Sequence, residues 1–215
     1  MTFADRREAG RRLAGALERL RDASPIVLAL PRGGVPVGFE IAQALAAPLD
    51  VLLVRKIGAP GREELGIGAV VEGAEPQIVL DEELLRLVDP PPGYVEAETA
   101  RQIAEIERRR HIYVGGHPPP ALQGHTIIVA DDGVATGSTA RAALRALRQF
   151  VPRSLVLAVP VAPEEALASL SEEADEVVCL LTPRRFHAVG AYYDDFRQMT
   201  DLEVIELLET ARHPS

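Results

Sequence analysis

The chain has 215 residues, of which 47% are hydrophobic and 26% charged, and its formal net charge is −9. These values are ordinary for a globular protein with one sizeable core, and 32 acidic against 23 basic side chains argue against a general nucleic-acid-binding surface. No apolar run reaches the length of about 18 residues that a membrane span needs, and the first residues lack a signal-peptide pattern, so we expect a cytoplasmic protein with no membrane partner.

The N-terminal part of the chain predicts an amphipathic helix, a buried strand and a glycine-rich turn. Residues 3–21 carry apolar side chains at helical spacing, and we interpret the arginines among them as a solvated helix face: Arg6, Arg7, Arg11 and Arg12. Ile26 to Leu30 is a continuous apolar run, which is typical of a parallel strand covered on both faces. Arg32-Gly33-Gly34 follows, where the glycines let the backbone approach a ligand. This turn indicates an anion site, although a tight turn alone would use the same glycines.

A second basic strand end is predicted further along the chain. Leu49 to Val54 indicates another buried strand, and Arg55 and Lys56 at its end carry charges that need solvent or an anion. Gly58 to Glu64 is polar and contains Gly and Pro, so we expect a loop there. Ile67 to Val71 and Gln77 to Leu80 predict a β-hairpin.

Residues 81–120 predict a helical excursion from the alternating strands and helices. Asp81 is a predicted N-cap for a short helix over residues 82–88, and proline-rich stretches bound a longer helix over residues 95–112. The longer helix has many charges and few apolar positions, so we expect it to be exposed or to form a subunit contact, as in a homodimer.

The stretch from His125 to Thr139 organises the chain. It begins as an apolar strand, meets the adjacent carboxylates Asp131 and Asp132, and turns into Thr136-Gly137-Ser138-Thr139 at the start of a helix. A helix N-terminus directs backbone N–H groups and the positive end of the helix dipole at an anion, and the hydroxyls add donors. The stretch therefore predicts a site for a phosphorylated ligand.

The rest of the chain alternates between strands and helices. Ser154 to Val159 and Glu176 to Leu181 predict strands with a helix between them, and a last helix spans residues 201–212. The pattern predicts the α/β class: a doubly wound, mainly parallel sheet with helices on both faces, a β-hairpin and a small hood or excursion. Residues 182–199 concentrate aromatic side chains, among them Phe186 and Tyr192. This segment and the excursion over residues 81–120 are the two candidates for the hood.

Three predicted strand ends carry polar or glycine-rich segments, at Arg32-Gly33-Gly34, at Arg55-Lys56 and at Asp131 to Thr139. In a parallel sheet such ends lie at one edge, where ligands bind. The glycine-rich turns suit phosphate groups, and the carboxylates suit ribose hydroxyls or a sugar-bound Mg²⁺. A generic dinucleotide site is disfavoured because residues 32–38 lack the Gly-x-Gly-x-x-Gly spacing, and a P-loop is excluded because Gly-Lys-Ser/Thr does not occur.

Residues 129–139, Val-Ala-Asp-Asp-Gly-Val-Ala-Thr-Gly-Ser-Thr, closely resemble the phosphoribosyl-diphosphate (PRPP) signature of the type I phosphoribosyltransferase family. Arg32-Gly33-Gly34 resembles the family's pyrophosphate loop and Arg55-Lys56 its basic strand end, so the resemblance covers about Ile26 to Val159. It implies a single phosphoribosyltransferase-like domain over residues 1–215. Such an enzyme transfers the phosphoribosyl group of PRPP to a nitrogenous, nucleobase-like acceptor with Mg²⁺-assisted loss of pyrophosphate.

The resemblance also implies a role for each matching residue. The residues it implies to be catalytic are Arg32, Lys56, Asp131 and Asp132. Asp131 and Asp132 would hold the ribose hydroxyls, directly or near Mg²⁺, and Arg32, Gly33, Gly34 and Lys56 would face the pyrophosphate. The 5′-phosphate would be held by Ala135, Thr136, Gly137, Ser138 and Thr139. Phe186 or Tyr192 could stack on the acceptor, or could simply cover the edge of the sheet.

Ala135 departs from one branch of the family. In the 6-oxopurine branch this position is an aspartate that handles the acceptor's proton, which alanine cannot do, whereas adenine-type enzymes tolerate alanine. A hypoxanthine-type acceptor is therefore disfavoured, and the acceptor's identity stays open.

Two other functions compete with the transferase. The first is a regulatory protein that senses PRPP or a nucleotide without turnover. The second is a hydrolase that uses Asp131 and Asp132 on Mg²⁺, which would leave the turn at residues 136–139 unexplained. The cations Arg32 and Lys56 favour the transferase, because pyrophosphate needs stabilisation mainly when it leaves.

Overall fold

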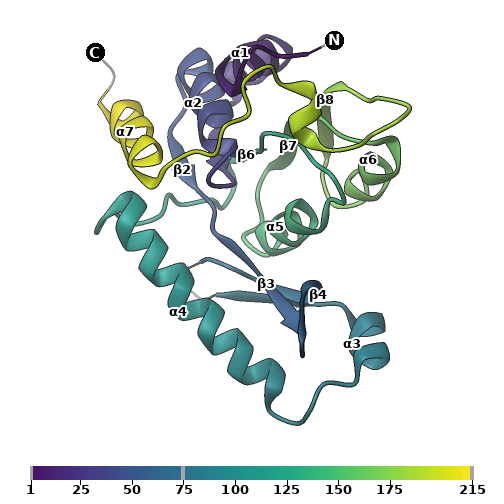
Figure 1. The fold of residues 1–215 in the computed structure, drawn as a ribbon. Helices are drawn as coiled ribbons and strands as arrows, with labels where there is room; N and C mark the ends of the chain where they lie inside the picture. Colours follow the sequence, from purple (N-terminus) through teal and green to yellow (C-terminus); the bar gives the residue numbers. More distant parts are fainter. Residues whose placement is uncertain (1, 74–75, 214–215) are drawn as a thin grey trace.

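The computed structural model describes residues 2–73 and 76–213. Its central sheet contains β1 (Ile26–Ala29), β2 (Leu49–Val51), β6 (Thr126–Ala130), β7 (Ser154–Val161) and β8 (Glu176–Leu181). The strands lie in the order β2-β1-β6-β7-β8, and every neighbouring pair is parallel (Figure 1). β1 and β6 are buried along their whole length, since their continuous apolar runs are covered on both faces.

Helices cover both faces of this sheet. The helices on one side are α1 (Arg6–Leu17), α2 (Gly34–Leu45) and α7 (Asp201–Arg212), which packs against α2; those on the other side are α5 (Ser138–Arg148) and α6 (Glu164–Leu170). Alternate strand residues enter opposite cores: Val27 and Ile128 face the first group, and Leu28 and Ile127 face the second. The predicted α/β class is confirmed.

A second, antiparallel sheet lies below the first in Figure 1. Its strands are β3 (Val54–Ala59), β4 (Arg62–Val71) and β5 (Gln77–Leu80), and it is flanked by α3 (Glu82–Val88) and the long α4 (Tyr94–Val114). The predicted pairing of residues 67–71 with 77–80 and the Asp81 cap of α3 are confirmed. Residues 74 and 75, between β4 and β5, lie outside the described part. Two 3₁₀ helices complete the fold, η1 (Glu18–Ala23) and η2 (Val189–Tyr192).

The predicted strand from Leu49 to Val54 is wrong as a single element. β2 ends at Val51, and Val54 already begins β3 in the other sheet. Leu52 and Leu53 between them are buried, with 4% and 3% exposed, so the apolar run continues across the junction. Hydrophobicity alone cannot distinguish one buried strand from two short ones in different sheets. Consequently Arg55 lies inside β3 rather than at a tip of the parallel sheet.

The predicted loop from Gly58 to Glu64 is also wrong. β3 runs to Ala59 and β4 begins at Arg62, so only Pro60 and Gly61 turn the chain, with Gly61 at a φ of +67°. Gly58 pairs with Gly66 and Ala59 with Arg62, with a shift of register between the two pairs, and a positive φ at the turn is easy for glycine. Within the described ranges, no helix is both long and apolar enough to span a membrane.

Candidate active site

The chain reverses its direction across the sheet between β1 and β6. From β1 it moves outward to β2, whereas from β6 it proceeds the other way to β7 and β8. In open parallel sheets, the carboxyl ends of the strands at such a switch point border ligand sites. The amide of Leu30 donates to the carbonyl of Ala130 at 2.9 Å, which fixes the two strand ends side by side. The segments after β1 and β6 therefore meet, as their sequences predict.

The glycine turn after β1 packs directly against the carboxylates after β6. A Cβ on Gly33 would lie 2.0 Å from Oδ2 of Asp132, and one on Gly34 would lie 2.6 Å from the carbonyl oxygen of Ala130. No larger residue fits at either position without displacing these groups. The peptide bond between Pro31 and Arg32 in the same turn is cis. Glycine is thus needed at both positions so that the turn can pack closely against Ala130 and Asp132, whether or not the turn itself requires it.

Asp131 and Asp132 form a pair of adjacent, largely buried carboxylates. The amide of Asp132 donates to Oδ1 of Asp131 at 2.8 Å. Burial, and then the neighbouring charge of Asp132, raise the pKa of Asp131 well above its usual range. Burial also raises the pKa of Asp132, against the opposing effect of Arg6. The protein alone compensates this negative charge incompletely, so the pair suits hydroxyl donors or a cation.

Arg6 is a site residue that the sequence interpretation missed. Its Nε donates to Oδ2 of Asp132 at 2.7 Å, and the two side chains are only 10% and 15% exposed. Its guanidinium carbon lies 4.0 Å from the ring centroid of Phe196, and its Nη1 donates to the carbonyl of Arg197 at 2.9 Å. A signal was present: Arg6 lies on the buried stripe of α1, at helical spacing from Gly10, Leu13 and Leu17.

The residues of the predicted phosphate turn lie at the N-terminus of α5. Gly137 caps the helix with a φ of +79°, and Ser138 is its first residue. Ala135 and Thr136 are exposed, and Oγ1 of Thr136 lies 3.3 Å from Oγ of Ser138. The first amides of a helix have no intrahelical acceptor, so those of α5 are suited to an anion.

Arg32 is held at the edge of the site by an acidic residue that begins α7. Its Nη1 lies 3.8 Å from Oδ1 of Asp201, which also accepts a hydrogen bond from the hydroxyl of Tyr113 at 2.7 Å. Burial, followed by the hydrogen bond with Asp201, raises the pKa of Tyr113 to about 12. Arg32 is 32% exposed and its ion pair is long, so the guanidinium is able to turn toward a more strongly charged anion.

Arg55 and Lys56 do not join this cluster in the described structure. Nε of Arg55 donates to Oε1 of Gln102 on α4 at 3.0 Å. Lys56 is exposed and pairs with Ala69 in the antiparallel sheet. The prediction that these cations lie at a tip of the parallel sheet is therefore wrong, because they belong to β3.

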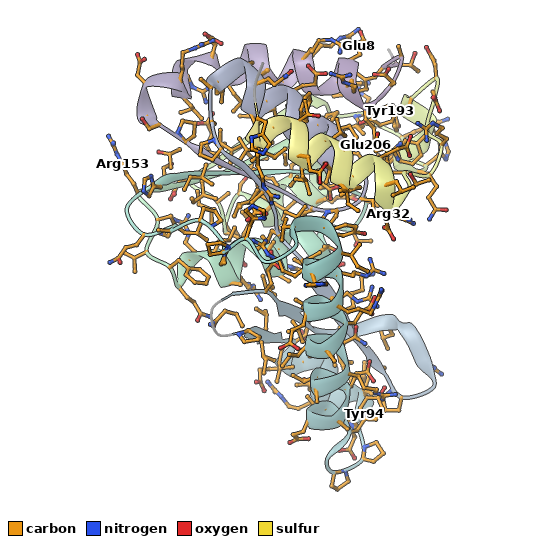
Figure 2. The ribbon with its side chains drawn as sticks, turned by 90° about the vertical axis from the view of Figure 1, so that its left-hand side faces the viewer. Glu8, Arg32, Tyr94, Arg153, Tyr193 and Glu206 are labelled. Atoms are coloured by element: carbon orange, nitrogen blue, oxygen red, sulfur yellow. The ribbon has the colours of Figure 1, made fainter. Side chains whose placement is uncertain are left out.

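The candidate hood, residues 182–199, contacts the segment that contains the carboxylate pair. The hydroxyl of Tyr193 donates to the carbonyl of Asp132 at 2.5 Å, and a Cβ on Gly133 would lie 2.5 Å from the side chain of Val189. Figure 2 shows Tyr193 and Arg32 in the upper part of the molecule, far from Tyr94 at the lower end of α4. Phe186 and Tyr192 stack on each other, with centroids 5.8 Å apart and planes 20° apart.

The donor set at the switch point fits Mg²⁺ only together with a ligand. Within residues 2–73 and 76–213, no three His, Cys, Asp or Glu side chains converge as a metal cage. Mg²⁺ commonly binds through one or two carboxylates plus water and substrate oxygens. Asp131 and Asp132 supply that partial set, so they would hold the ion jointly with a sugar or a phosphate.

Comparison with known proteins identifies the family. The family model described as the phosphoribosyl transferase domain matches residues 4–196, which is most of the chain. The chain belongs to the phosphoribosyl transferase family. The matched region contains the glycine turn, the carboxylate pair, the start of α5 and the aromatic hood segment as far as residue 196. The resemblance seen in the sequence is thereby confirmed.

Individual relatives agree with this family assignment. Two Mycobacterium tuberculosis proteins, from strains H37Rv and CDC 1551, carry provisional phosphoribosyl transferase names; each is 43% identical over 209 residues, or 97% of this chain. The chain spans about half the length, 47%, of these curated relatives. The crystal structure of TT1426 from Thermus thermophilus is 48% identical, with a TM-score of 0.84 over 97% of this chain and 98% of that one. AQ2163 from Aquifex aeolicus, 15% identical over 86% of this chain and 78% of that one with a TM-score of 0.52, shares the fold.

Proposed function

We propose that residues 1–215 form one catalytic domain that transfers the phosphoribosyl group of PRPP to a nitrogenous, nucleobase-like acceptor. The observation that carries the proposal is the contact of Gly33 with Asp132 at the switch point. This contact supports a site formed by the glycine turn after β1 and by the carboxylate pair and the start of α5 after β6. PRPP presents a pyrophosphate, a ribose diol and a 5′-phosphate, which these three features suit respectively.

Each feature has a distinct task in this reaction. Asp131 and Asp132 accept hydrogen bonds from the ribose hydroxyls and orient the sugar. The α5 N-terminus and the hydroxyls of Thr136, Ser138 and Thr139 fix the 5′-phosphate. The amides of Gly33 and Gly34 and the guanidinium of Arg32 face the pyrophosphate as it leaves. Mg²⁺, held by the two carboxylates together with the substrate, would neutralise charge on that leaving group.

The transition state of this transfer concentrates charge at the leaving pyrophosphate, and its sugar resembles an oxocarbenium ion. Fixed dipoles and cations then account for most of the rate enhancement, and no protein nucleophile is required. Arg32 is the cation that follows β1 in the glycine turn, whereas Arg6 is paired with Asp132. Lys56 extends from the β3–β4 hairpin, and its contribution to the same step remains a prediction.

Ala135 lies at the exposed start of the turn and offers no proton acceptor. An acceptor that is already anionic, or one that loses its proton to solvent, suits this site. Residues 182–199, with Phe186 and Tyr192, are the proposed hood that selects it. A homodimer formed through α4 remains a further prediction.

A PRPP-sensing protein without turnover is the second candidate. The observation that favours it is Ala135, because alanine leaves the turn able to hold a phosphate but without a group that takes a proton from an acceptor. The test is pyrophosphate release from PRPP and Mg²⁺ across purines, pyrimidines and pyridine carboxylates. Acceptor-dependent release supports the transferase. Silence across the whole panel with retained PRPP binding supports the sensor instead.

A further inference from the structure

A second cavity lies away from the switch point, between the C-terminal half of α4, β2 and residues 119–123. Its volume is about 700 Å³, within the range of sites for small organic molecules. Much of its wall is apolar, formed by Leu28, Leu52, Ile103, Ile106, Leu122 and Phe150. None of the residues assigned above to PRPP lines it, and neither does any residue of the aromatic segment 182–199.

The polar wall of this cavity is an ion triad of Asp50, Arg110 and Glu72. Nη2 of Arg110 donates to Oδ2 of Asp50 at 2.7 Å, and Nη1 donates to Oδ1 of Asp50 at 3.1 Å. Nη1 also reaches Oε1 of Glu72, at the longer distance of 3.2 Å. The three side chains are 9%, 17% and 12% exposed, respectively. The fork of the guanidinium is therefore used mainly by Asp50.

Glu72 is the least compensated member of the triad. Burial raises its pKa to about 7, although the charge of Arg110 opposes the shift. Glu107 and His111 on α4 also line the cavity, so three carboxylates face one guanidinium. An anionic ligand would meet this excess of negative charge and an arginine that is already paired. A ligand with a positive group would instead supply the charge that Glu72 lacks.

We propose that this cavity is a second small-molecule site, which binds an organic cation with an apolar body, such as an amine or an amidine. The positive group pairs with Glu72, and the body packs on Leu52, Ile106 and Leu122. The Asp50–Arg110 pair forms the fixed back wall. The site is independent of the proposed transferase chemistry, because no residue is shared between the two.

Benzamidine is a suitable probe, and its neutral analogue benzamide is the matched control ligand. Titration calorimetry on the full chain is expected to show benzamidine binding and no benzamide binding at the same concentrations. Glu72→Gln should weaken benzamidine binding at least about tenfold, because the buried charge partner is lost. Glu96→Gln, an exposed carboxylate in the first turn of α4, should leave it unchanged. Asp132→Asn should also leave it unchanged, which separates the cavity from the switch point.

The pH dependence gives a second readout. Glu72 must be ionised to pair with the cation, so benzamidine affinity should rise about tenfold from pH 6 to pH 8. The groups that face Glu72 are Asp50, Arg110, Glu107 and His111. The variant His111→Gln should keep this pH dependence, since the effect belongs to Glu72.

A blocking variant keeps the test valid if Glu72→Gln is poorly folded. Ala121 is exposed and lines the cavity, so Ala121→Trp fills space while leaving the triad intact. It should abolish benzamidine binding. The proposal is overturned if wild type does not bind benzamidine, if benzamide binds equally well, or if Glu72→Gln and Ala121→Trp both bind as wild type does. A triad that only anchors α4 would give the first of these results.

Discussion

Replacing Arg6 by methionine tests whether α1 supports the carboxylate pair. Removal of one partner from a buried ion pair costs about 3–5 kcal/mol, because the other charge is left uncompensated. The Arg6–Asp132 pair, with side chains 10% and 15% exposed, is close to that regime. Asp132 can relieve part of the cost by taking up a proton, since burial already raises its pKa. We therefore expect Arg6→Met to lower the free energy of unfolding by about 2–4 kcal/mol at pH 7.

Urea unfolding followed by circular dichroism measures this change, with Arg7→Met as the matched control. Arg7 lies next to Arg6 on α1, but it is 51% exposed and its partner Glu40 also contacts Arg11. Its replacement should cost less than about 1 kcal/mol. In the double variant with Asp132→Asn, the loss caused by Arg6→Met should shrink by about 1–3 kcal/mol. Equal costs for Arg6→Met and Arg7→Met, or additive effects in the double variant, would refute the reasoning.

Three further predictions follow from individual contacts. Burial raises the pKa of Glu72 from 4.5 to about 7, so the stability that the protonated side chain contributes is complete below pH 4.5 and is lost as pH rises through 7. Between pH 4.5 and 8, the free energy of unfolding of wild type, measured in urea, should fall by about 3 kcal/mol relative to that of Glu72→Gln, and parallel pH curves for the two proteins would contradict this. A Cβ on Gly33 would lie 2.0 Å from Asp132, so Gly33→Ala should weaken PRPP binding at least about tenfold in calorimetry. The control Gly15→Ala, at a position with open space around it, should bind PRPP as wild type does, and equal affinities for the two variants would remove the glycine turn from the site. Phe186→Ala should raise the KM for the acceptor about tenfold and leave PRPP affinity unchanged, and an unchanged KM would mean that the aromatic pair only covers the sheet.

The fold could be predicted largely because the central strands are buried on both faces. β1 is apolar throughout and β6 is apolar from Ile127 to Ala130, Asp81 caps α3 as expected, and α7 begins at Asp201 as expected. The same criterion failed at residues 49–54, since burial continues from one sheet into the next across Leu52 and Leu53. Composition failed at residues 58–64, because backbone pairing outweighs local preference in a hairpin.

The candidate site was only partly accessible from the sequence. Residues adjacent in the signature, such as Asp131 and Asp132, are necessarily close, and the parallel sheet brings the glycine turn beside them. Arg6 and Asp201 come from distant helices, so their contacts with Asp132 and Arg32 depend on how those helices pack. The charge of Arg6 suggested a solvated face, although its position on the apolar stripe of α1 indicated burial.

The central claim is that the switch point binds PRPP through its carboxylate pair. Titration calorimetry of PRPP with Mg²⁺ tests it most directly, on wild type and on the double variant Asp131→Asn with Asp132→Asn. The matched control is Glu82→Gln with Glu83→Gln, an adjacent and exposed carboxylate pair on α3. We predict that wild type and the α3 control bind PRPP with equal affinity, and that the aspartate variant binds at least about tenfold more weakly. Unchanged affinity in the folded aspartate variant would contradict the assignment of the site.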